Sequence, residues 1–169
     1  MGTAATVIIA ITVVCILLLI AGIILTFLSN RLACPTTYLG LLGIGLTIAD
    51  IPATNSLIFW GIATAIVICL EYMLPKKITS SRRGVGYIAG AALAGTFVGL
   101  AISHEWMIVG AVAGAILGGI AYSRTPAGSI MEFPSSKFLN YLCAKGLPAV
   151  VTMCMAGTSV LWFAAILNQ

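Results

Sequence analysis

The chain has 169 residues, of which 61% are apolar and 7% are charged. A soluble domain has roughly 45–50% apolar and about 25% charged residues, so this composition excludes a water-soluble globule. The formal charge of +4 comes with only eight Lys and Arg residues, scattered in short turns. They are too few for a surface that follows nucleic-acid phosphates, and we expect no nucleic-acid partner. The sequence predicts a single all-α integral membrane domain over residues 1–169, a polytopic transmembrane helical bundle.

Six segments meet or approach the length of about 20 apolar residues that a helix needs to cross the bilayer. In chain order they are residues 4–28, 36–49, 56–74, 84–103, 106–122 and 147–167. The second segment is short and is bounded by Pro35 and Pro52. A re-entrant segment is therefore the alternative to a full crossing at this position. We expect six spans, because removing the second would place Arg31 on the opposite side from the other basic residues.

The stretch between the fifth and sixth segments is the only substantial extramembrane piece. Ser135 or Ser136 can cap a helix there that places its apolar residues on one face. This pattern predicts either an amphipathic helix on the inner leaflet or an inward extension of the sixth span that bends at Gly146 and Pro148.

The basic residues indicate the topology. With six spans, all eight fall on one side of the membrane: Arg31, Lys76, Lys77, Arg82, Arg83, Arg124, Lys137 and Lys145. The positive-inside rule makes that side cytoplasmic and predicts that both termini lie outside.

Small residues recur every four positions in the fourth and fifth segments. The glycines of this pattern are Gly86, Gly90, Gly95, Gly99, Gly110, Gly114 and Gly118. Helices in lipid associate through close van der Waals contact, which small faces permit. The turn around His104 and Glu105 is so short that the two helices must be antiparallel neighbours. We expect their bare faces to pack together in a glycine-packed hairpin; a homo-oligomer seam and a glycine-lined pore are the alternatives.

Three stretches together resemble a known family. They are Leu-Glu-Tyr-Met-Leu-Pro at residues 70–75, the basic turn and glycine-rich start at residues 80–90, and the glycine-rich run at residues 110–118. The chain thereby resembles domain-of-unknown-function family 456, glycine-rich bacterial integral membrane proteins, over about residues 20–124. The resemblance implies the same architecture and a bacterial inner (cytoplasmic) membrane location, and it implies no established biochemical activity.

Ionisable side chains at membrane depth are costly, which makes them candidates for function. Glu71 is the one such residue inside a predicted span, either as a proton or cation relay or as a carboxylate that reaches the interface and pairs with the next basic turn. Asp50, His104 and Glu105 would make the outer face acidic, as a cation or proton entry site or as polar caps of short turns. We expect no metal centre and no cofactor, because a stable metal site needs three or four supported ligands.

Two further interpretations concern the inner side. Arg82 and Arg83 open the fourth segment, where free amide hydrogens and positive charge could hold a lipid headgroup; topogenic charges are the alternative. We expect no enzyme, because a nucleophile needs an oriented base within reach. The one histidine, His104, is predicted outside, whereas Cys34 and Cys143 are predicted inside.

The sequence leaves three functions open. The first is a small transporter or channel for an ion or small solute, favoured by the three-plus-three arrangement of spans that inverted-repeat transporters have. The second is a non-catalytic accessory or structural membrane subunit, and the third is a lipid-binding or lipid-handling protein. The expected partners are membrane lipids and either a second copy of the chain or another membrane subunit.

Overall fold

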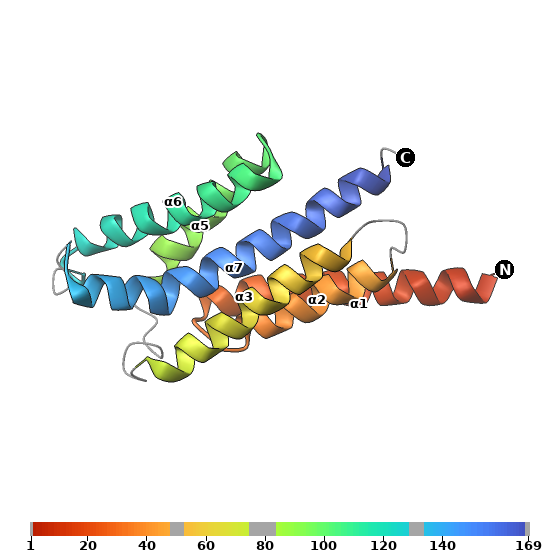
Figure 1. Cartoon of the computed structure of the whole chain (residues 1–169), viewed down its shortest axis with the longest axis horizontal. Coiled ribbons are helices and arrows are strands. Elements are labelled where there is room, and N and C mark those ends of the chain that lie inside the picture. Colours follow the sequence, from red (N-terminus) through yellow and green to blue (C-terminus); the bar gives the residue numbers. More distant parts are fainter. Residues whose placement is uncertain (1, 48–52, 75–83, 129–133, 168–169) are drawn as a thin grey trace.

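The computed structural model describes residues 2–47, 53–74, 84–128 and 134–167. Within these ranges all regular structure is helical (Figure 1). The helices are α1 (Gly2–Phe27), α2 (Ala33–Thr47), α3 (Ala53–Met73), α5 (Val85–Leu100), α6 (His104–Ser123) and α7 (Ser136–Leu167). Each of the six predicted segments coincides with one of them, so the prediction of an all-α bundle is confirmed.

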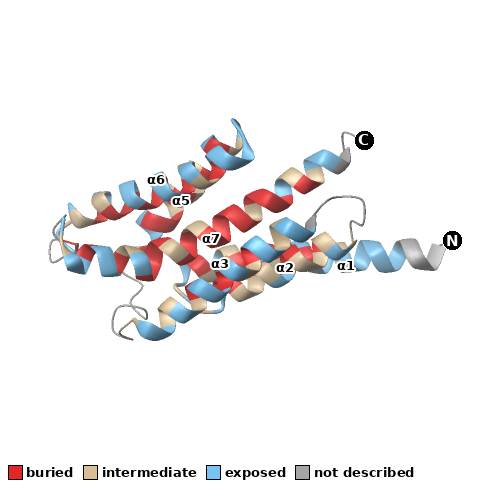
Figure 2. Cartoon of the chain, in the orientation of Figure 1, coloured by how far each residue is buried: buried red, intermediate tan, exposed pale blue. Residues whose placement is uncertain are grey.

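Several of these helices have the length and composition of membrane spans. The four longest apolar stretches lie in α1, α3, α6 and α7 and contain 22, 20, 20 and 30 residues, and α5 is a shorter apolar helix. Helix α1 is apolar on all sides and leaves large side chains such as Ile9 and Leu17 exposed (Figure 2). A helix of this kind is stable only where lipid or protein surrounds it. The described residues form a membrane helical bundle.

Helix α2 runs antiparallel to α1 and passes as one uninterrupted helix from one end of the bundle toward the other (Figure 1). It begins before Pro35, because proline is tolerated in the first turn of a helix. Its contact with α1 is close: a Cβ on Gly22 would overlap the Thr37 hydroxyl, and one on Gly40 would lie 2.8 Å from the Cys15 carbonyl oxygen. With 15 residues, α2 is one continuous helix but is shorter than the about 20 residues that a full crossing needs.

Helix α7 is the centre of the bundle and contacts each of the other five described helices. It is continuous from Ser136 through Pro148, so the stretch before residue 147 extends the last span and is not a separate amphipathic helix. The reason is burial, since Phe138 packs beside Gly119 and Tyr141 packs against Gly84. These aromatic side chains bind the first turns of α7 to the protein instead of to lipid headgroups.

Helices α5 and α6 touch backbone to backbone. A Cβ on Gly95 would overlap the carbonyl oxygen of Gly110, and one on Gly110 would overlap that of Gly95. Three more glycines meet a backbone carbonyl oxygen of the opposite helix in the same way: Gly99, Gly114 and Gly118. The glycine-packed antiparallel hairpin is present.

Gly86 and Gly90 take no part in this contact, contrary to expectation, because a Cβ on either would meet nothing within 4 Å. The α5 row that meets α6 is residues 87, 91, 95 and 99. Gly86 and Gly90 each precede a member of that row by one residue, which is about 100° around a helix. They lie on the neighbouring face.

The described basic residues gather toward the end of the bundle where α1, α3 and α6 end, whereas both chain termini lie toward the opposite end (Figure 1). Three tyrosines also cluster at the basic end. The rings of Tyr87 and Tyr122 lie 5.9 Å apart, and those of Tyr122 and Tyr141 lie 5.7 Å apart. Tyr122 and Tyr141 are buried and pack within the bundle, whereas Tyr87 is exposed.

Candidate functional site

A polar cluster lies where the α1–α2 turn, the end of α3 and the α7 helix meet. It surrounds a cavity of about 20 Å³, which is room for about one water molecule. The cavity is lined by Thr26, Ser29, Asn30, Ala33, Glu71, Val85, Ala144, Lys145 and Pro148. We call this the Lys145 cavity.

Lys145 is only 5% exposed, and its ammonium group donates a hydrogen bond to the Ser29 hydroxyl. It lies nine residues beyond Ser136, which is about 14 Å along the α7 axis. The next residue, Gly146, faces Ala115 near the middle of the 20-residue α6. A buried ammonium group is costly unless it is paired, so this lysine marks a candidate site.

Two further charges complete the cluster. The Glu71 carboxylate interacts electrostatically with both Arg31 and Lys145. The Arg31 guanidinium also lies over the Tyr72 ring, 5.8 Å from its centroid, which is within cation–π range. One carboxylate therefore interacts with two cations from different elements, and these three described groups carry one positive charge in excess when ionised.

The α1–α2 turn presents the Ser29 hydroxyl in an unusual way. The Asn30 N–H donates to the Leu25 carbonyl and the Ser29 N–H donates to the Thr26 carbonyl, each at 3.0 Å. This pattern is a Schellman motif, and Ser29 occupies its left-handed position with a φ of 55°. Glycine is usual there because a Cβ is unfavourable at positive φ. Serine is less favourable than glycine in this backbone conformation, but its hydroxyl accepts the hydrogen bond from Lys145.

Helix α7 is also tied to α2 beside the cavity. The Cys34 thiol donates to the Pro148 carbonyl at 3.5 Å and lies 3.3 Å from the Thr152 hydroxyl. Pro148 lacks an N–H, so it cannot donate to the carbonyl of Ala144 one turn earlier. Ala144 and Pro148 both line the cavity. The backbone hydrogen bond that α7 lacks therefore lies beside the cavity.

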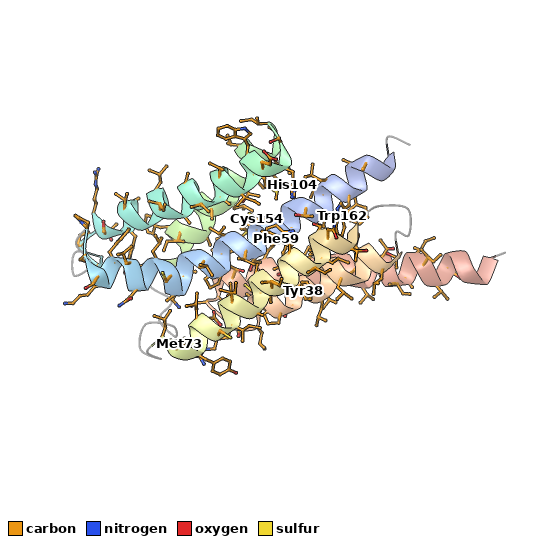
Figure 3. The ribbon with its side chains drawn as sticks, viewed as in Figure 1. Tyr38, Phe59, Met73, His104, Cys154 and Trp162 are labelled. Atoms are coloured by element: carbon orange, nitrogen blue, oxygen red, sulfur yellow. The ribbon has the colours of Figure 1, made fainter. Side chains whose placement is uncertain are left out.

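The predicted outer residues lie far from this cluster. His104 and Glu105 are exposed in the first turn of α6, where the Ser103 hydroxyl accepts from the Trp106 N–H at 3.3 Å. Figure 3 shows His104 at the α5–α6 turn and Met73 at the other end of the bundle, so the structure does not bring His104 and Glu71 together. A carboxylate in the first turn suits the helix dipole, which favours a capping role for Glu105.

Three predicted site residues, Asp50, Arg82 and Arg83, lie outside the described residues. Among the residues that the structure describes, no group of three potential metal ligands occurs.

Sequence reasoning assigned Lys145 and Arg31 to topology alone and did not single out Ser29. The signal that could have found Lys145 is that the same helix continues for 22 largely apolar residues beyond it. The assumption that the last span starts at residue 147 concealed this signal.

No protein-family model, no curated protein and no solved structure matches this chain. The resemblance to family 456 stays a prediction, and function must be inferred from the residues themselves.

Proposed function

We propose that the protein transports protons or another small ion across the membrane, with Glu71 and Lys145 as the exchanging pair. The observation that supports this most is the burial of Lys145 beside a carboxylate and a water-sized cavity. Ionisable groups that face the interior of a membrane bundle and pair with one another are typical of ion pathways and proton relays.

The exchange of a proton between these two side chains needs no further group. A proton on the Lys145 amine can pass to the Glu71 carboxylate, directly or through one water molecule, which leaves a neutral amine and a neutral carboxylic acid. The ion pair and the neutral pair have the same total charge, so the exchange adds no net charge to a low-dielectric region. Arg31 supplies a fixed positive charge that interacts with Glu71, and the Ser29 hydroxyl accepts a hydrogen bond from the Lys145 ammonium group.

The test is proton flux in liposomes that enclose a pH-sensitive dye. We expect Lys145→Met and Glu71→Gln each to lower the flux at least tenfold, which corresponds to about 1.4 kcal/mol. Asn140→Met is the control, because Asn140 is an exposed polar residue of the same helix and should leave the flux unchanged. Wild-type flux no higher than that of empty liposomes contradicts the proposal, as does undiminished flux in both cavity variants.

Orientation and location are part of the proposal. The described basic residues at one end and both termini toward the other support a cytoplasmic basic end with the termini outside. A bacterial inner membrane is the location that the resemblance to family 456 supports. Fusion of a periplasm-dependent reporter to the C-terminus tests both points.

A second candidate is an accessory membrane subunit. The observation in its favour is the free α5 face with Gly86, Gly90 and Ala94 at four-residue steps, since such faces let helices approach closely. This role predicts a complex with another membrane protein that is stable in mild detergent and that Gly86→Ile and Gly90→Ile dissociate. It also predicts that the wild-type protein carries no proton flux. The third role, lipid handling at Arg82 and Arg83, stays a prediction because these residues lie outside the described ranges.

A further inference from the structure

A groove separates α6 from the first half of α7, on the surface of the bundle. It has a volume of about 170 Å³. Its lining consists of Val112, Ala115 and Ile116 from α6, and Leu142, Cys143, Gly146, Leu147 and Val150 from α7. None of these side chains carries a charge or an oxygen. The groove exists because Ala115 and Gly146 face each other, and two small residues leave the space that larger side chains would fill.

The size and the chemistry of the groove define its occupant. An apolar cavity of about 150 Å³ stays dry and binds a hydrocarbon of the size of benzene. Cys143 is exposed, and so are Val112 and Ile116, which means that the groove opens to the surface. In a bilayer that surface faces lipid, so a segment of an acyl chain can enter from the side and gain van der Waals contacts on both walls.

Two cations lie beyond the inner end of the groove. Arg124 follows Ile116 by eight residues and Lys137 precedes Cys143 by six, which are about 12 Å and 9 Å along the helices. Both side chains are exposed. The carboxylates that the structure describes, Glu71 and Glu105, belong to the end of α3 and the opposite end of α6. The described charged residues at the end of the groove where a lipid headgroup would lie, Arg124 and Lys137, are therefore positive.

We propose that this groove is a binding site for an anionic phospholipid, with one acyl chain between α6 and α7 and the phosphate beside Arg124 and Lys137. The site is distinct from the Lys145 cavity and from the predicted headgroup site at Arg82 and Arg83. Apolar walls select the chain, and the two cations select a negatively charged headgroup.

Native mass spectrometry in mild detergent tests this site, with phosphatidylglycerol and phosphatidylcholine of identical chains as the probes. We expect wild-type protein to retain phosphatidylglycerol roughly thirtyfold better, from about 1 kcal/mol for each of two cations. Cys143→Phe fills the groove from an exposed position and should abolish specific retention of both lipids. Leu139→Phe is the matched control, because Leu139 is 60% exposed on the same helix and does not line the groove.

Arg124→Gln with Lys137→Gln separates the two parts of the site and disturbs no buried residue. The double variant should still bind lipid but retain both headgroups equally. Equal retention of the two lipids by wild-type protein overturns the proposal, as does unchanged retention by Cys143→Phe. A dimer mass that Cys143→Phe removes also overturns it, because the groove would then be the seat of a second copy.

Discussion

Replacing Ser29 by glycine separates the two roles of the α1–α2 turn. The backbone at φ 55° favours glycine, and relief of that conformation is worth about 1 kcal/mol. The hydroxyl accepts a hydrogen bond from the buried Lys145 ammonium, and such bonds to charged groups contribute about 1.5–3 kcal/mol. Ser29→Gly should therefore destabilise the wild-type protein by about 1 kcal/mol, because the lost hydrogen bond outweighs the relaxed backbone.

The same substitution should stabilise a protein that already carries Lys145→Met, by about 1 kcal/mol, because only the backbone effect remains. The assay is reversible unfolding in mixed micelles, with the four proteins of the double-mutant cycle compared. Ser29→Ala provides the control: it keeps the unfavourable backbone and removes the hydroxyl, so it should destabilise only the protein with Lys145. An equal effect of Ser29→Gly in both backgrounds would refute the pairing of Ser29 with Lys145.

Three further predictions follow from the packing. Gly95→Leu should destabilise the protein by about 3 kcal/mol in the same unfolding assay, since its Cβ would overlap a backbone oxygen of α6, whereas Gly90→Leu should be neutral because open space surrounds Gly90. Tyr72→Leu should destabilise the protein by about 0.5–1 kcal/mol through loss of the Arg31 contact, and a stability equal to that of the wild type would rule that contact out. A maleimide should leave the buried Cys154 unmodified until the protein unfolds, as peptide mass mapping would show.

The sequence was sufficient to predict the elements of this fold, because a span needs a long apolar run and such runs are visible without tertiary information. It also predicted the α5–α6 hairpin from small residues at four-residue steps. It could not decide which row of small residues meets α6. The row with Gly86 and Gly90 and the row with Gly95 and Gly99 are both bare, and they differ by one residue, so only the packed structure distinguishes them.

The candidate site was predicted less completely. Glu71 was identified because a carboxylate inside an apolar span is conspicuous. The burial of Lys145 inside the last helix was not predicted, because it depends on whether α7 begins at Ser136 or near residue 147. That choice is made by tertiary contacts of Phe138 and Tyr141. The role of Ser29 could not be predicted for a similar reason. Its left-handed conformation and its contact with Lys145 both appear only in the folded structure.

Proton flux through liposomes that contain the double variant Lys145→Met with Glu71→Gln tests the central claim most directly. If the two residues exchange one proton as a unit, the double variant loses no more flux than the more damaged single variant. Losses that multiply would show that the two side chains act independently, and they would contradict the assignment of Glu71 and Lys145 as one transport site.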